Sequence, residues 1–125
     1  MGQFRVTARL TGSTGRTESV ELLVDTGATF LVVPQAIADR LDIAPQRQLP
    51  VVIAGGTRMT WPVGEIRVAI EGQETTTPCF IAPSGPLLLG AVALESLLLT
   101  VDPIAKRLVP TDGYVLVSSG GSAIS

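Results

Sequence analysis

The stretch that decides the fold is residues 20–34, VELLVDTGATFLVVP. Two apolar, β-prone runs flank a short polar turn, and Asp25 lies where the first run ends. A carboxylate in this position must be hydrogen-bonded, paired or protonated, because burial of an unpaired charge is costly. The tripeptide Asp25-Thr26-Gly27 alone is typical of an ordinary turn. Because it lies between two apolar strands, however, a functional carboxylate and an ordinary turn are about equally favoured here.

Alternating apolar residues on both sides of this stretch predict a protein made mostly of short strands. One short helix is expected to begin at Pro34, and a second over residues 91–98 with Leu94, Leu97 and Leu98 on its apolar face. The pattern favours a mainly β fold, a closed or orthogonally packed β-barrel with one or two short helices. The expected strands cover residues 4–10, 18–24, 28–33, 51–54, 59–63, 66–70, 75–81, 108–110 and 114–117.

Length and composition indicate one folded domain. The chain has 125 residues, of which 46% are hydrophobic and 16% charged, so it can bury a core and is not expected to be disordered. We expect the domain to span residues 1–117 and the Ser- and Gly-rich residues 118–125 to form a flexible tail. The net charge of −2 gives no basic surface for nucleic acid, so no nucleic-acid partner is expected.

Several kinds of chemistry are excluded because the chain has no histidine. Catalytic triads, imidazole bases and the common His-containing metal sites all need one, so we expect no metal and no cofactor. Cys79 is the single cysteine and is expected to be a small buried side chain. The uncharged residues 75–94 are broken by proline and glycine and do not predict a membrane span. With no signal peptide expected, we predict a cytoplasmic protein.

The chain resembles the retropepsin-like aspartic proteases, most closely the small single-domain members from prokaryotes. The residues that carry the resemblance are VELLVDTGATFLVVP at 20–34, a glycine hairpin at 55–57, and LLLGAVALESLLLTVDP at 87–103. It covers roughly residues 4–110 of the chain. The resemblance implies the acid-protease type of β-barrel, a homodimer, and hydrolysis of peptide or protein substrates.

The resemblance also implies roles for individual residues. Asp25 would be the catalytic carboxylate, Thr26 would hydrogen-bond across the dimer, and Gly27 would let substrate approach the backbone. Leu89 and Gly90, with the leucine before them, would pack beneath this loop. A glycine hairpin would close over bound peptide as a flap, although its residues alone are equally typical of an ordinary turn. The residues expected to contact substrate are Ala28, Thr29, Ala54, Gly55, Gly56 and Leu88.

The requirement for a homodimer has a chemical reason. Amide hydrolysis without metal or histidine needs one group to activate water and another to protonate the carbonyl oxygen. Two carboxylates at close range can divide these tasks, because they share one proton. The chain offers one suitable acid, Asp25, and a two-fold axis would bring two copies of it together. Asp102, the other candidate within the chain, is expected to cap or turn the chain before Pro103 instead.

Some features leave alternatives open. Viral members of the family usually carry Asp and Arg where this chain has Thr29 and Ala91, and the two charges are absent together. Trp61 either covers the cleft or packs in the core. The leading hypothesis is an aspartic endopeptidase that cuts extended peptides. The alternatives are a weakly active or inactive module of the same fold that dimerises or binds peptides, and a domain that acts only within a larger assembly.

Overall fold

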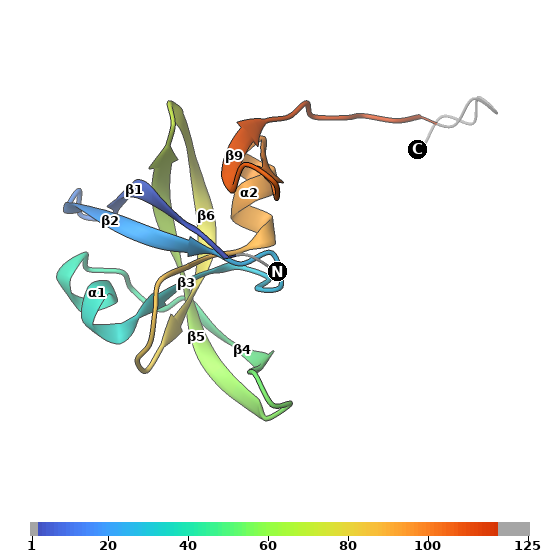
Figure 1. The fold of residues 1–125 in the computed structure, drawn as a ribbon. Helices are drawn as coiled ribbons and strands as arrows, with labels where there is room; N and C mark the ends of the chain where they lie inside the picture. Colours follow the sequence, from blue (N-terminus) through green and yellow to red (C-terminus); the bar gives the residue numbers. More distant parts are fainter. Residues whose placement is uncertain (1–2, 118–125) are drawn as a thin grey trace.

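The structure, a computed structural model, describes residues 3–117 and is mostly β (Figure 1). The predicted tail at residues 118–125 lies outside the described residues. Two short helices accompany the strands, as the sequence predicts. In chain order the elements are β1 (Arg5–Thr11), β2 (Thr17–Val24), β3 (Leu31–Pro34), α1 (Gln35–Arg40), β4 (Arg47–Val52), β5 (Arg58–Ile70), β6 (Gln73–Ala82), β7 (Leu88–Leu89), α2 (Ala91–Leu97), β8 (Leu99–Asp102) and β9 (Arg107–Pro110).

The main sheet closes on itself. Its strand order is β1-β2-β7-β3-β6-β5-β4, and an additional pairing joins β1 to β5. That pairing places Leu10 opposite Val68 and completes a ring of six strands. β4 stands outside the ring because it pairs only with the first half of β5, where Leu49 faces Trp61. A ring of this kind is compatible with the closed barrel that the sequence predicts.

Strands β3, β6 and β7 each contribute side chains to two hydrophobic clusters. Leu31 and Val33 of β3 belong to the main core inside the ring, whereas Val32 between them belongs to a second, smaller cluster. Successive side chains of a strand point to opposite faces, so a continuous apolar run is buried only where both faces are covered. The second cluster consists of Val32, Val63, Phe80 and Ala82, with Phe30, Leu49, Val51, Trp61 and Leu88 packed against it.

The region after α2 differs from the prediction. The expected helix over residues 91–98 ends at Leu97, and Leu98 is 43% exposed in a left-handed conformation instead of lying on the apolar face. Leu99–Asp102 then forms β8, a strand that the sequence pattern did not predict, and it pairs with β9 in a separate two-stranded sheet. The left-handed Leu98 turns the chain, which redirects the leucine run from helix to strand.

Two predicted strands are also corrected. The strand expected over 28–33 begins only at Leu31, because the carbonyl groups of Ala28 and Thr29 accept hydrogen bonds from the start of α2 instead of from a strand. Residues 114–117 form no strand at all and are exposed. Their β-prone composition finds no partner strand within the described chain. Pro34 also precedes the helix as its N-cap and is not its first residue.

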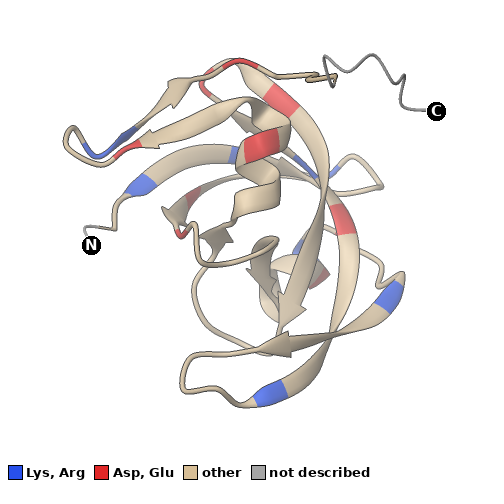
Figure 2. Cartoon of the chain, turned by 90° about the vertical axis from the view of Figure 1, so that its right-hand side faces the viewer, with Lys and Arg blue, Asp and Glu red and all other residues tan. Residues whose placement is uncertain are grey.

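No helix in residues 3–117 is both long and apolar enough to cross a membrane. Charged residues of both signs are scattered over the strands and turns (Figure 2). Arg40 of α1 makes two hydrogen bonds to the Glu18 carboxylate on β2, at 2.7 and 3.0 Å. This pair ties α1 to the outside of the ring, and the neighbouring guanidinium lowers the pKa of Glu18.

Candidate active site

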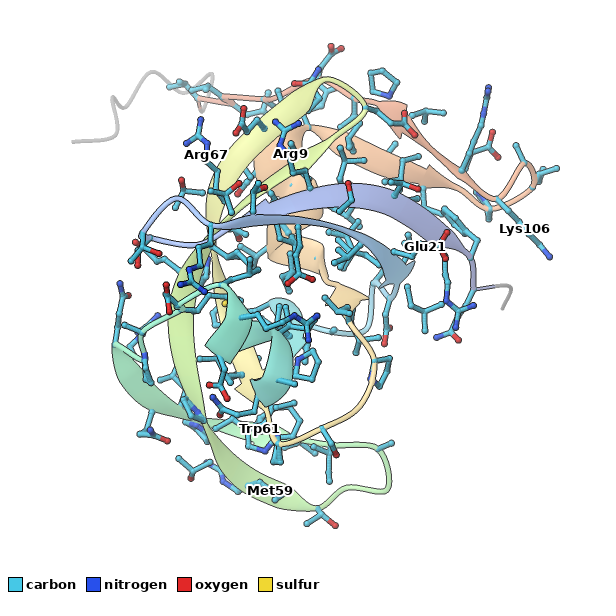
Figure 3. The ribbon with its side chains drawn as sticks, turned by 90° about the vertical axis from the view of Figure 1, so that its left-hand side faces the viewer. Arg9, Glu21, Met59, Trp61, Arg67 and Lys106 are labelled. Atoms are coloured by element: carbon cyan, nitrogen blue, oxygen red, sulfur yellow. The ribbon has the colours of Figure 1, made fainter. Side chains whose placement is uncertain are left out.

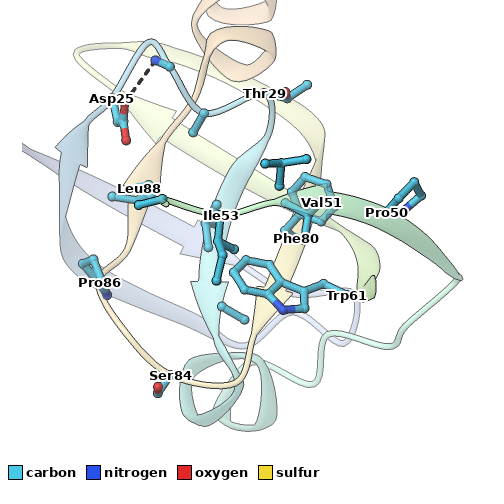
Figure 4. Close-up of a pocket in the computed structure, with 16 residues that line it drawn as sticks. Asp25, Thr29, Pro50, Val51, Ile53, Trp61, Phe80, Ser84, Pro86 and Leu88 are labelled. Atoms are coloured by element: carbon cyan, nitrogen blue, oxygen red, sulfur yellow. Dashed lines mark hydrogen bonds between the residues drawn. The ribbon is translucent and has the colours of Figure 1, made fainter. Parts of the chain in front are cut away.

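The loop that carries Asp25 follows directly from β2. The Asp25 N–H donates to the Leu89 carbonyl at 3.0 Å, which continues the β2–β7 pairing by one residue. The Gly27 N–H donates to Asp25 Oδ1 at 3.0 Å, a bond drawn in Figure 4. The Ala28 N–H donates to the Asp25 carbonyl at 3.1 Å and closes a tight turn. These bonds hold the half-buried carboxylate in one position and leave its Oδ2 for other partners.

The segment around Gly90 supports this loop from beneath. Ala91 and Val92 donate their N–H groups to the carbonyls of Ala28 and Thr29, at 2.8 and 3.0 Å. A Cβ atom on Gly90 would lie 2.4 Å from the Phe30 carbonyl oxygen and 2.6 Å from that of Ala28. Only glycine allows this approach of two backbones. Gly90 therefore determines how closely the Asp25 loop approaches the start of α2.

A cavity of about 540 Å³ opens beside Asp25. Its floor is the second hydrophobic cluster, where Phe80 lies 5.1 Å from Phe30 and 6.1 Å from Trp61 between ring centroids. Figure 4 shows Trp61, Val51 and Ile53 facing this space across from Asp25 and Leu88. The lining residues are Asp25, Gly27, Ala28, Thr29, Val32, Pro50, Val51, Val52, Ile53, Ala54, Trp61, Phe80, Ala82, Ser84, Pro86 and Leu88.

The β4–β5 hairpin forms one wall of the cavity. Its turn is closed by the Ile53 N–H donating to the Thr57 carbonyl at 2.9 Å and the Gly56 N–H donating to the Ile53 carbonyl at 3.0 Å. Gly55 and Gly56 have φ angles of +91° and +89°, which favour glycine. The hairpin projects from the ring at the bottom of Figure 1, and Met59 and Trp61 lie along its second strand in Figure 3.

The comparisons with known proteins agree with this geometry. A family model described as gag-polyprotein putative aspartyl protease matches residues 12–96, more than half of the chain. The chain belongs to this family of retropepsin-like aspartic proteases. A solved structure with a similar fold is "EIAV protease complexed with the inhibitor HBY-793", with a TM-score of 0.60 and 18% identity over 86% of this chain and 93% of that chain. No curated protein sequence matches the chain.

These matches confirm two expectations, the retropepsin-like resemblance and the acid-protease type of fold. The structural match is too distant in sequence to support more than the fold. What this chain can do therefore depends on the residues that line its own cavity.

The structure places most of the predicted site residues around one space. Asp25, Gly27, Ala28, Thr29, Ala54 and Leu88 line the cavity. The other three predicted residues do not. Thr26 is exposed and does not line the cavity, and Gly55 and Gly56 form the exposed tip of the hairpin.

The sequence does not identify the other residues that line the cavity. Val32 and Phe80 were expected only as parts of buried strands, and nothing in their pattern separates a cavity floor from a core. Pro50 and Val51 lie on β4, the strand that leads into the predicted flap. This position beside a glycine turn is the signal that could have identified them as cavity residues. Trp61 both lines the cavity and packs against Phe80, so the two alternatives for it coexist.

Two other acidic residues, Asp102 and Glu95, do not line the cavity. Asp102 Oδ1 accepts hydrogen bonds from the N–H groups of Ile104 and Ala105, both at 3.1 Å, which confirms that it caps a turn. Glu95 is exposed on α2.

No group of three or more potential metal ligands occurs in residues 3–117. Burial raises the pKa of Cys79 to about 12, so this thiol stays protonated within the sheet.

Proposed function

We propose that this chain is an aspartic endopeptidase whose active unit is a homodimer, with Asp25 of each copy in one shared site. The observation that carries the proposal is that Asp25 is the single acid among the described residues lining the cavity. One carboxylate cannot both activate water and supply a proton to the carbonyl oxygen. The half-buried Asp25 beside the exposed Thr26 leaves this part of the loop free to meet a second copy.

In the proposed reaction the two Asp25 carboxyl groups hold one proton between them. The ionised carboxylate takes a proton from water, whose oxygen attacks the peptide carbonyl carbon, while the protonated carboxyl donates to the carbonyl oxygen. Collapse of the tetrahedral intermediate breaks the C–N bond, and the nitrogen leaves with a proton. The Gly27 N–H bond to Asp25 Oδ1 orients each carboxylate for these transfers.

The proposed substrate is a peptide in an extended conformation with apolar side chains near the cut. Phe80, Val32 and Leu88 on the cavity floor would bury such side chains. The hairpin wall would add strand-like hydrogen bonds to the peptide backbone, since β4 has a neighbour on one side only. Nothing in the lining apart from Asp25 carries a charge to select a charged side chain.

The test is cleavage of an apolar peptide by the wild-type chain and by Asp25→Asn. We expect kcat/KM to fall by about 100- to 10,000-fold in the variant, because the amide can neither accept nor share the proton. The folded state should be retained, with an unchanged circular dichroism spectrum. Glu95→Gln is the matched control, because it makes the same acid-to-amide change on an exposed helical position.

Two further readouts separate the proposal from a binding module of the same fold. A shared proton gives a bell-shaped dependence of kcat/KM on pH, and a pepstatin-type inhibitor should block cleavage. If Asp25→Asn cleaves as fast as the wild type, the proposal is wrong. If neither chain cleaves but both bind the peptide equally, the chain is a peptide-binding module.

A further inference from the structure

The β4–β5 hairpin carries positive charge and no negative charge. Between Ile43 and Gly64 the chain has two charged residues, Arg47 at the start of β4 and Arg58 at the start of β5. Both residues are exposed. In Figure 2 the hairpin at the bottom shows blue segments and no red ones. Because the whole chain has a net charge of −2, the hairpin is a basic element on an acidic protein.

These two arginines form no ion pair with any acid of residues 3–117. The ion pairs of the described chain involve other arginines and are Arg16–Asp42, Arg40–Glu18 and Arg67–Glu74. Arg47 lies opposite Val63, and Arg58 lies opposite Val52. Apolar residues therefore occupy the cross-strand positions where an acid could pair with either arginine. The two charges remain available to a molecule that binds along the hairpin.

The two arginines lie near the two ends of the free edge of β4. This strand has six residues, from Arg47 to Val52, and it pairs with β5 on one side only. Val52, which lies opposite Arg58, lines the cavity, and so does Pro50. A peptide that adds to this edge rises by about 3.3 Å per residue, as β4 itself does. It therefore passes both arginines within one stretch of the length of β4.

We propose that Arg47 and Arg58 select substrates in which acidic side chains flank the apolar residues at the cut. This inference rests on the proposed function and deepens it by naming the substrate class. Neither arginine lines the cavity, so the apolar floor and the charged rim are separate. The floor would hold apolar side chains, and the guanidinium groups at the rim would bind carboxylates. Attraction between exposed charges is modest, so it adds to the apolar preference without replacing it.

The charge at the centre of the site explains why the acidic residues belong at the ends of the bound stretch. Asp25 is the single acid among the described residues lining the cavity, and a pair of such groups with one proton keeps one negative charge. A substrate carboxylate beside the cut would be repelled by that charge and would lose its water in an apolar cavity. Near Arg47 or Arg58 the same carboxylate stays exposed and meets a positive charge.

The experiment compares three peptides that differ only in their flanking residues. Each has about four apolar residues in the centre, bounded on both sides by Glu, by Gln or by Lys, so that the flanks match the length of β4. At a pH of about 6 the Glu side chains are ionised. We expect wild-type kcat/KM to be about three- to tenfold higher for the Glu-flanked than for the Gln-flanked peptide, and lowest for the Lys-flanked one. Salt at about 0.5 M should reduce this difference, because it screens exposed charges.

Charge variants test whether the hairpin makes the selection. The double variant Arg47→Glu, Arg58→Glu should prefer the Lys-flanked peptide over the Glu-flanked one. The double variant Arg47→Lys, Arg58→Lys should keep the preference for Glu, because it keeps both positive charges. Arg107→Glu is the matched control, since it reverses a charge at an exposed position on β9 outside the cavity lining, and it should keep the wild-type ratio. The changes should appear mainly in KM, because the contact is the same in the ground state and the transition state.

The uncharged peptide separates this inference from the proposed function. If wild-type protein cleaves the Gln-flanked peptide at least as fast as the Glu-flanked one, this inference fails and the proposed function stands. If the doubly reversed variant keeps the preference for Glu, the two arginines do not select the substrate, and the inference is overturned. If wild-type protein cleaves none of the three peptides, both proposals fail.

Discussion

Gly90→Ala tests how the Asp25 loop is supported. The backbone at Gly90 has a φ of −93°, which any residue can adopt, so the added methyl group acts only through its contacts. That methyl would lie 2.4 and 2.6 Å from two carbonyl oxygens of the loop, those of Phe30 and Ala28, and neither belongs to a flexible side chain. The loop must rise from α2, which strains the hydrogen bonds from Ala91 and Val92.

The magnitude follows from these contacts. Overpacking costs about 1–3 kcal/mol, and each of the two hydrogen bonds contributes about 1 kcal/mol. If both hydrogen bonds are lost, the variant should therefore lose about 3–5 kcal/mol of unfolding free energy, and its Tm should fall by about 10–20 °C. A shift of about 1 Å in a catalytic group lowers the rate by about 100-fold, so kcat/KM should fall by that factor at temperatures where the variant is folded.

Thermal unfolding and peptide cleavage are the two assays. Gly113→Ala is the matched control, because its added methyl would lie 3.5 Å from Leu98 Cδ2, an ordinary contact. Its unfolding free energy should change by no more than about 0.5 kcal/mol. If Gly90→Ala has the Tm and kcat/KM of the wild type, the close approach of the two segments does not position Asp25, and the reasoning is refuted.

Three other perturbations follow from the structure. Cys79, whose pKa is raised to about 12 by burial, should react with a thiol reagent only after denaturation; equal rates in native and denatured protein would contradict this. Arg40→Gln removes the group that lowers the pKa of Glu18. That stabilisation is present above the ordinary Glu pKa and is lost as pH falls through the lowered folded value, so the variant's Tm deficit should be larger at neutral than at strongly acidic pH. Gly56→Val, at φ +89°, should strain the hairpin tip by about 1–3 kcal/mol and lower kcat/KM; unchanged values of both would exclude a role for the left-handed tip.

Local pattern predicts the fold where each strand has one buried face. Residues 4–10 alternate, and β1 appears within one residue of that range. The pattern fails where pairing between distant segments decides the outcome. Residues 114–117 have the composition of a strand but meet no partner in the described chain, and residues 99–102 pair with a strand that follows them. The closure of the ring through Leu10 and Val68 also joins segments far apart in sequence, which no local pattern records.

The candidate site likewise contains residues that the local sequence predicts and residues that it does not. Asp25 could be singled out because a carboxylate after an apolar strand is a local signal with a physical cause, whereas the place of Gly90 beneath the loop follows only from the resemblance to the retropepsin-like family. Val32 and Phe80 could not, because their alternation between two clusters depends on which faces the folded ring covers. No pattern within one chain can predict the second Asp25, because a symmetry-related copy of the chain would supply it.

The most direct test of the shared site is a mixing experiment with Asp25→Asn. Wild-type chain is held at a fixed concentration where it is dimeric, the variant is added, and cleavage of a small apolar peptide is measured after exchange. With equal amounts, random pairing leaves about half of the wild-type chains in wild-type dimers, so activity should fall to about half and approach zero with excess variant. Cleavage that stays constant at every ratio would mean that each chain completes its own site, which would contradict the two-copy carboxylate pair.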